Sequence, residues 1–229
     1  MIVGQGLLAR SFSPHFQDNE DVVIFASGVS NSLETSHEAF SRERQMLADM
    51  LACNPRTAVY FGSCGVAGSA EAATPYMRHK HDMESLVLAH PGGLVLRLPQ
   101  VVGITSNPNT LTNFLRDRIL QDEPFAVWAK AERNLVDVDD IVAISNILIG
   151  SPPAQPSMIS IASQQSLPMP EIIDIFERVL KRKANCVMED RGTPLSIDSA
   201  RALEVARHLG IDLGRGYAER VLRKYYAPH

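Results

Sequence analysis

The chain has 229 residues and a formal net charge of −4, with 45% hydrophobic and 21% charged residues. This length predicts one large domain, or one domain with an added lobe, and the composition is that of an ordinary globular protein. The weak negative charge argues against a nucleic-acid-binding protein, because such proteins need basic surfaces to contact phosphates. No apolar run approaches the roughly 20 residues that a membrane-spanning helix requires.

The cysteines and the first residues indicate a cytoplasmic protein. The opening stretch MIVGQGLLARSF has no charged segment before a long apolar core, as a signal peptide would have. The three cysteines form no Cys-x-x-Cys pair, which argues against a disulfide framework or a zinc site. His79 and His81 flank Lys80, but side chains two residues apart diverge on a helix. We therefore expect reduced thiols and no metal site.

Residues 1–103 alternate between short apolar runs and longer helical patterns. The expected strands are 1–3, 21–26, 57–61 and 94–98, and the expected helices are 7–12, 38–53 and 76–89. Such alternation is typical of parallel βαβ units with helices on both faces of the sheet. The prediction is an α/β, Rossmann-like core over residues 1–103.

The pattern changes after Gly103. A polar loop at 104–109 is followed by mixed elements, and the stretch 200–226 is helical in character. The expected helices are 111–120, one entered at 139–140, and 170–181, and the expected strands are 125–129, 133–138 and 158–162. We expect residues 104–229 to complete the core and to form a small C-terminal α/β substrate-binding lobe, in one compact unit with the first part.

The turn GQGLLA connects the first expected strand to the first expected helix and matches G-x-G-x-x-A. In such a turn Gly4 allows the tight bend, Gly6 lets the backbone approach a pyrophosphate, and Ala9 lets the helix pack closely on the strand. Its position between a strand and a helix is the context that a dinucleotide site requires. The alternative is a glycine turn that only joins the two elements.

The stretch TPYMRHKHDME places Tyr76 and Lys80 four residues apart. On a helix they would share one face, and an ammonium one turn from a phenol would lower the pKa of that phenol from its usual value near 10. Ser63 ends an expected strand, and the carboxyl ends of parallel strands line the ligand crevice. Ser63, Tyr76 and Lys80 are therefore expected near the glycine turn. The alternative is a solvated helix face.

With these residues in place, the chain resembles an extended short-chain dehydrogenase/reductase of the NAD-dependent epimerase/dehydratase family, whose members act on nucleotide sugars. Eight segments follow in the family's order along nearly the whole chain. They are GQGLLA, DVVIFASGVSNS, YFGSCGVAG, PYMRHK, LRLPQVVG, NPNTLTNF, RNLVDVDDIV and PLSIDSARA. The resemblance implies a Rossmann fold and NAD or NADP as cofactor.

The resemblance also implies roles for single residues. Tyr76 would be the general acid/base for a sugar hydroxyl or carbonyl, Lys80 would lower its pKa and hold the nicotinamide ribose, and Ser63 would contact the same substrate oxygen. The implied cofactor-binding residues are Gly4, Gly6, Leu7, Leu8, Ala26, Ser27, Gly28, Tyr76, Lys80 and Pro99.

On the substrate side, the resemblance implies binding by Ser30, Gln100, Asn109 and Arg133. Arg133 would grip the substrate diphosphate, a contact that suits a bidentate guanidinium, and Asp140 would cap the next helix. The alternatives are an ion pair of Arg133 with Asp137 or Asp139, and ordinary loop hydrogen bonds for Gln100 and Asn109.

The sequence departs from the family's pattern in its first half. Only about ten residues separate the first helix from DVVIFA, where the family places two strands, their helices and the residue that reads the adenosine ribose. We therefore expect a sheet shortened by about two strands and leave NAD versus NADP open. The asparagine that often precedes the serine strand is not evident, since Arg42 and Glu43 occupy that region. Cys64, beside Ser63, has no visible base partner and is a weak candidate nucleophile.

Two functions are consistent with these features. The first is a cytoplasmic oxidoreductase that reduces a 4-keto sugar nucleotide or epimerises that carbon. The second, suggested by the shortened first half, is a reductase-fold protein with little redox activity that binds a nucleotide or nucleotide sugar as a sensing or scaffolding module. The resemblance also implies a homodimer through helices 38–53 and 76–89, and the alternative is that their apolar faces only cover their own sheet.

Overall fold

The computed structural model describes residues 1–29, 31, 34–67, 74–152 and 154–228, so the expected substrate residue Ser30 lies outside the described residues. The chain divides into two compact units. Unit 1 is Met1–Leu98 with Val138–Ile161, and unit 2 is Pro99–Asp137 with Ala162–His229. The two units are not separated at one point of the chain near residue 103. The strand at 157–160 pairs with the strand that ends at Leu98 and therefore belongs to unit 1.

Unit 1 is built on a parallel sheet of five strands, as the sequence predicts. In spatial order the strands are β1 (Ile2–Val3), β2 (Val22–Phe25), β3 (Thr57–Ser63), β4 (Gly93–Leu98) and β9 (Ser157–Ser160). The helices are α1 (Leu7–Phe16), α2 (His37–Ala52), α3 (Pro75–Leu88) and α5 (Val138–Gly150), with a 3-10 turn, η1, at Cys64–Ala67. The spatial order of the strands is their order in the sequence, with β1 at one edge.

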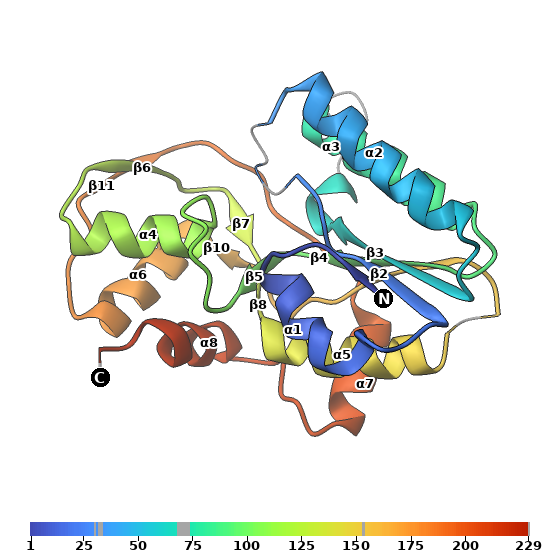
Figure 1. Cartoon of the computed structure of the whole chain (residues 1–229). Helices are drawn as coiled ribbons and strands as arrows, with labels where there is room; N and C mark the ends of the chain where they lie inside the picture. The colour runs from blue at the N-terminus through green and yellow to red at the C-terminus, as the bar shows by residue number, and fades with distance from the viewer. Residues whose placement is uncertain (30, 32–33, 68–73, 153, 229) are drawn as a thin grey trace. The chain divides into compact units, whose positions relative to one another are not determined.

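Helices cover both faces of this sheet, and Figure 1 shows α2 and α3 on one side with α1 and α5 on the other. The faces differ because successive side chains of a strand point to opposite sides. Tyr60 of β3 belongs to the core cluster that includes Leu47 of α2 and Met83 of α3. The next residue, Phe61, packs against Phe12 of α1 with ring centroids 5.1 Å apart.

The connection through α1 has an unusual hand. The three single-helix connections, β1–α1–β2, β2–α2–β3 and β3–α3–β4, all step across the sheet in the same direction. Because α1 lies on the face opposite to α2 and α3, its crossover must have the opposite hand (Figure 1). Nearly all such crossovers are right-handed, so the α1 connection is the left-handed exception. It is the connection from which the sequence analysis finds two strands missing.

Side-chain caps and a proline fix where the helices of unit 1 begin. The Oγ atom of Ser36 accepts a hydrogen bond of 3.2 Å from the Ala39 amide at the start of α2, and Thr74 caps α3 in the same way through the Met77 amide. Pro75 occupies the first turn of α3, where its missing N–H costs nothing. The helix that carries Tyr76 therefore starts where the sequence predicts.

Unit 2 consists of four helices and three strand pairs. The parallel pairs are β5 (Gln100–Val102) with β8 (Leu135–Asp137) and β6 (Phe125–Trp128) with β11 (Cys186–Glu189), and the antiparallel pair is β7 (Glu132–Arg133) with β10 (Leu167–Pro168). The helices are α4 (Leu111–Leu120), α6 (Met169–Leu180), α7 (Ala200–His208) and α8 (Tyr217–Tyr226). The buried Asp137 accepts hydrogen bonds from Tyr225 at 2.6 Å and Lys224 at 2.7 Å, which fasten α8 to β8. No helix of the described residues is long and apolar enough to cross a membrane.

Candidate functional site

The glycine turn lies where β1 ends, beside the loop that follows β2. Gly4 has a φ of +131°, a conformation that favours glycine, and a Cβ atom there would lie 2.5 Å from the Ala26 carbonyl oxygen. Gly6 is the N-cap of α1, and a Cβ atom on Gly6 would meet no atom within 4 Å. No side chain caps the first turn of α1, and no acidic residue lies in it. Among the described residues, no side chain therefore caps the N–H groups of this first turn, and the space beside Gly6 is open.

Ser63, Tyr76 and Lys80 lie together at the carboxyl end of β3. The Ser63 hydroxyl is close enough to the Tyr76 phenol to lower its pKa. The Lys80 Nζ atom lies 5.8 Å from the centroid of the Tyr76 ring, one helical turn away along α3. The expectation that Tyr76 and Lys80 share a helix face is confirmed. Neither residue is on a solvated face, since Tyr76 is half-buried and Lys80 is buried.

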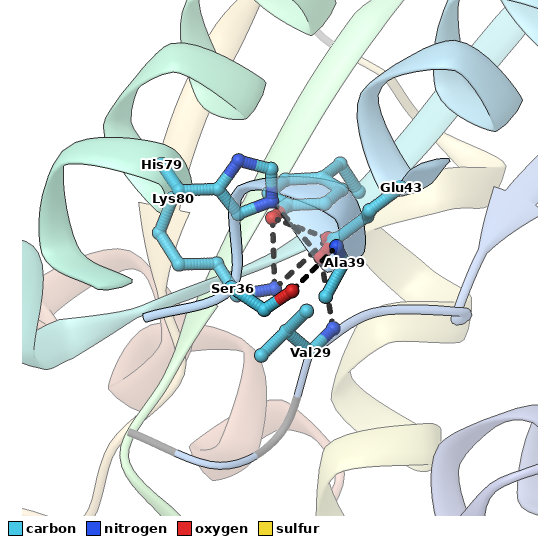
Figure 2. Close-up of polar contacts among 7 residues, drawn as sticks. Val29, Ser36, Ala39, Glu43, His79 and Lys80 are labelled. Atoms are coloured by element: carbon cyan, nitrogen blue, oxygen red, sulfur yellow. Dashed lines mark hydrogen bonds and ion pairs between the residues drawn. The ribbon is translucent and has the colours of Figure 1, made fainter. Parts of the chain in front are cut away.

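A buried charge cluster surrounds Lys80 (Figure 2). The Nζ atom donates to Glu43 Oε1 at 3.1 Å and to the Tyr60 hydroxyl at 3.0 Å. The second oxygen of Glu43 accepts from the Val29 amide at 2.8 Å and lies 3.0 Å from Nε2 of His79. Figure 2 shows the Glu43 carboxylate at the centre of these contacts, between α2, α3 and the loop after β2.

The expectation that Lys80 lowers the pKa of Tyr76 is wrong for this arrangement. Burial of Tyr76 and the negative charge of Glu43 together raise its pKa to about 12, and the Ser63 hydroxyl offsets only part of this rise. Burial, followed by the negative charge of Glu43, also raises the pKa of Tyr60 well above its usual value. The physical reasons are first the burial of the phenol and second the Glu43 carboxylate, whose negative charge opposes that of Lys80.

The cofactor residues expected around the turn lie in unit 1, apart from Pro99. Leu7 and Leu8 open α1 and are half-buried, and Ala26 and Ser27 directly follow β2. A Cβ atom on Gly28 would lie 2.8 Å from Glu43 Oε1 and 3.0 Å from Lys80 Nζ, so its loop passes directly over the charge cluster.

Arg133 belongs to β7 in unit 2 and is half-buried. Its guanidinium donates to the Glu132 carbonyl oxygen at 2.7 Å, and burial lowers its pKa. Its expected alternative partner, Asp137, is bound instead by Lys224 and Tyr225. Within the described part of the chain Arg133 forms no ion pair with a carboxylate, and a half-buried cation of this kind favours an anionic ligand.

Pro99, Gln100 and Asn109 also lie in unit 2. Pro99 is half-buried and directly precedes β5, whose first residue, Gln100, donates its backbone N–H to Asn134. Asn109 is exposed, and its backbone N–H donates to the side-chain oxygen of Asn107 at 2.9 Å. The buried amide in this region is Asn113, which donates to the Thr105 and Asn107 carbonyl oxygens at 2.9 Å each and shapes the loop.

Cys64 does not have the environment of a nucleophile. It is buried, and burial raises its pKa to about 12, although a hydrogen bond with Ser160 and the charge of Arg97 act in the opposite direction. Reactive cysteines are partly exposed and have lowered pKa values. The three cysteines are free thiols, and the described residues contain no cluster of three or more histidine, cysteine or acidic side chains that could hold a metal.

The model of the NAD dependent epimerase/dehydratase family matches residues 12–162. The chain belongs to this family. The match covers unit 1 from α1 to β9 and the first part of unit 2, including every residue expected to be catalytic. No curated protein matches the chain.

Solved structures of nucleotide-sugar enzymes share the fold of this family member. MoeE5, solved with UDP-glucuronic acid and NAD, is 18% identical with a TM-score of 0.69 over 89% of this chain and 77% of its own. The dTDP-glucose 4,6-dehydratase of Bacillus anthracis, solved with NAD, is 13% identical with a TM-score of 0.69 over 90% and 71%. RMD from Pseudomonas aeruginosa, complexed with NADPH, is 18% identical with a TM-score of 0.60 over 91% and 82%.

The sequence patterns give no role to the groups around Lys80, namely Glu43, His79 and Tyr60. Glu43 lies in the region where the family's asparagine is expected and has no predicted partner, and His79 is considered only as a metal ligand. A signal was available, because Glu43 falls on the same face of α2 as Leu47 and Met50, which are buried. A carboxylate on the apolar face of a helix needs a buried cation or hydrogen-bond donors.

Proposed function

We propose that this family member is an NAD(P)-dependent oxidoreductase of nucleotide-sugar metabolism, which reduces a 4-keto sugar nucleotide or epimerises that carbon. The observation that carries the proposal is the grouping of Ser63 and Tyr76 with Lys80, whose Nζ atom lies 5.8 Å from the centroid of the Tyr76 ring. These groups lie at the same edge of the parallel sheet as the glycine turn, where ligands bind in such folds.

The residues of unit 1 fit the diphosphate and nicotinamide parts of a dinucleotide. The open space at Gly6, beside N–H groups that no described side chain caps, suits a diphosphate. An ammonium has three donors, and Lys80 uses two on Glu43 and Tyr60, which leaves one for a ribose hydroxyl. For the adenosine part, the described residues contain no strand between α1 and β2 that would carry a ribose-binding side chain. We therefore expect weak selection between NAD and NADP.

In the proposed reaction each residue has a distinct task. The cofactor, when bound, supplies or takes up a hydride at the sugar carbon. Tyr76 exchanges a proton with the sugar oxygen, and the Ser63 hydroxyl donates a hydrogen bond to the same oxygen. Lys80 contributes one ribose contact and a positive charge behind the ring.

Arg133 supports a nucleotide-sugar substrate. Its guanidinium is half-buried and its only hydrogen-bond partner in the described residues is a carbonyl oxygen. A diphosphate would supply the missing negative charge and could accept two parallel hydrogen bonds. Gln100 and Asn109 are proposed as further substrate contacts.

Tyr76→Phe tests the proposal, because it removes the exchangeable proton and keeps the ring. We expect at least a hundredfold loss of turnover of 4-keto or 4-hydroxy sugar nucleotides, with the affinity for NAD unchanged. Tyr225→Phe, which removes a phenol in unit 2, is the matched control. Wild-type turnover in Tyr76→Phe would exclude Tyr76 as the acid/base. A reductase releases oxidised cofactor with each turnover, whereas an epimerase recycles it.

The second candidate is a protein that binds a nucleotide sugar without turnover. The specific observation in its favour is that the Glu43 carboxylate and the Tyr60 hydroxyl occupy two of the three hydrogen bonds that Lys80 could offer a ligand. Calorimetry with NAD and NADP separates the two functions, since a sensing or scaffolding module would bind neither at millimolar concentration.

We also propose a homodimer through α2 and α3, as the family resemblance implies. Among the apolar residues of these helices, Leu47, Met50, Met83 and Val87 pack on their own sheet. Leu51 and Leu86 are half-buried and also pack against this core, whereas Met46 is 38% exposed and remains for a partner. Light scattering at micromolar concentration checks the dimer.

A further inference from the structure

The buried cluster around Glu43 has no role in the function proposed above, although it contacts a residue of the site directly. Glu43 is 4% exposed and lies on α2, while its partners Tyr60, His79 and Lys80 come from β3 and α3. A carboxylate is costly to bury, and this one is stabilised by four groups at 3.4 Å or less. Such a cluster must contribute either to stability alone or to the chemistry of Lys80.

The contacts of Glu43 determine where the Lys80 ammonium lies. Its Oε1 atom and the Tyr60 hydroxyl bind Nζ at 3.1 and 3.0 Å, and the Lys80 side chain is only 7% exposed. The other oxygen, Oε2, is fixed by the Val29 amide and by His79, whose ring stacks on Phe40 with centroids 4.5 Å apart. The carboxylate therefore cannot turn away from Lys80 without losing both contacts of Oε2.

The charges of the cluster also act on the Tyr76 phenol. The ammonium of Lys80 favours the phenolate, whereas the carboxylate of Glu43 disfavours it, so the pair presents little net charge to Tyr76. The other titratable groups near the pair in the described residues are Tyr60, His79 and, one turn farther along α3, the buried Glu84. The negative charge of Glu84 is paired with Arg97 at 2.6 Å.

We propose that Glu43 is a positioning residue of the site, which holds Lys80 and offsets its charge so that Tyr76 remains a protonated phenol and acts as a proton donor. This inference rests on the proposed function for the role of Tyr76. It deepens that function by assigning the direction of proton transfer, from the phenol to the sugar oxygen. A protonated phenol can give its proton to a carbonyl oxygen while the carbonyl carbon receives a hydride, with its two electrons, from the reduced dinucleotide. Removal of a proton from a hydroxyl group needs the phenolate. The site is therefore set for keto-sugar reduction rather than epimerisation.

The first test needs only the ligand-free protein. Tyrosine labelled with ¹³C at Cζ reports the ionisation of each of the five phenols, and Tyr76→Phe assigns the Tyr76 signal. We expect Tyr76 to stay protonated through pH 10.5 in the wild type, above the usual tyrosine value of about 10. A wild-type midpoint at or below pH 10 overturns the proposal without any Glu43 variant.

The second test compares Glu43→Gln with Glu38→Gln, which makes the same chemical change at an exposed position of the same helix. In Glu43→Gln the Tyr76 midpoint should fall by about 1 pH unit or more, and in Glu38→Gln it should not move. Circular dichroism checks that each variant is folded. An unchanged Tyr76 midpoint in folded Glu43→Gln overturns the proposal, and if that variant does not fold, the wild-type titration decides.

Turnover measurements separate this inference from the proposed function. With a 4-keto sugar nucleotide and reduced cofactor, kcat should decline at high pH as Tyr76 ionises. In Glu43→Gln the pH of this decline, the upper pH limit of kcat, should be lower than in the wild type by as much as the Tyr76 midpoint is. If Tyr76 titrates as expected but no sugar nucleotide is turned over, the proposed function fails and the positioning by Glu43 stands. If turnover occurs and neither the midpoint nor the pH limit depends on Glu43, only the inference fails.

Discussion

The Ala26 carbonyl oxygen lies 2.5 Å from the position that a Cβ atom on Gly4 would take. The backbone of the glycine turn is therefore in direct contact with the end of β2, and β1 can pair with β2 only because Gly4 has no side chain. The requirement for glycine at this position comes from the protein's own packing. At Gly6 the protein imposes no such requirement, because the space is open.

These two glycines should respond differently to replacement by alanine. Gly4→Ala combines a φ of +131° with a backbone clash, so we expect a loss of about 1–3 kcal/mol or more in the free energy of unfolding. Gly6→Ala has neither problem and should change that free energy by less than about 0.5 kcal/mol. Its methyl group would instead fill the space proposed for the diphosphate and weaken NAD binding. Urea unfolding and calorimetry measure the two effects, and equal stability losses would contradict this account.

The half-buried guanidinium of Arg133 should contribute to the affinity for the substrate and not to the affinity for the cofactor. Arg133→Ala removes a charged hydrogen-bond donor and is expected to raise the Kd for a nucleoside diphosphate sugar by roughly tenfold to a hundredfold. Arg133→Lys should recover only part of the loss, since an ammonium cannot bind bidentately. Arg207→Ala, at an exposed position of α7, is the control. If calorimetry gives the same Kd for wild type and Arg133→Ala, the proposed diphosphate contact is excluded.

The buried Glu43 should make stability depend on pH. Burial alone would raise the pKa of its carboxyl group, but the hydrogen bond with His79, the charge of Lys80 and the Val29 amide lower the pKa overall. A carboxyl group with a lowered pKa in the folded state stabilises the protein above its unfolded pKa, and this contribution is lost as the pH falls through the folded pKa.

The difference in unfolding free energy between wild type and Glu43→Gln should therefore be large at pH 6 and smaller at pH 3. At pH 6 we expect about 3–5 kcal/mol, because the variant leaves Lys80 buried without its counter-ion. Urea titrations at the two pH values provide the measurement, with Glu38→Gln as the variant that should show no such dependence. A difference that is independent of pH would mean that the pKa of Glu43 is the same in the folded and unfolded protein, which would contradict this account.

The sequence was sufficient to predict the parts of the fold that local patterns encode. The apolar run at Val22–Phe25 and the proline at the start of α3 predicted their elements because burial and backbone geometry act within a few residues. The order of Ser63, Tyr76 and Lys80 predicted their meeting, because the first ends a parallel strand and the others lie one helical turn apart.

The parts that the sequence did not predict depend on packing between distant segments. Glu43 meets Lys80 from a position 37 residues earlier in the chain, and only the packing of α2 against α3 brings them together. The predicted direction of the pKa shift of Tyr76 was wrong for the same reason, since the helical spacing shows the ammonium but neither the burial of the phenol nor the Glu43 counter-ion. The short strand β11 was also missed, because its partner β6 is about 60 residues away and two of its four residues are exposed.

The left-handed crossover bears on the order in which the protein folds. Local geometry favours the right-handed connections through α2 and α3, whereas α1 is held on the far side of the sheet by contacts such as that of Phe12 with Phe61. Those contacts exist only once β3 is in place. We therefore expect β1 and α1 to dock last and to open first in native-state hydrogen exchange, which makes the glycine turn the final piece of unit 1 to be assembled.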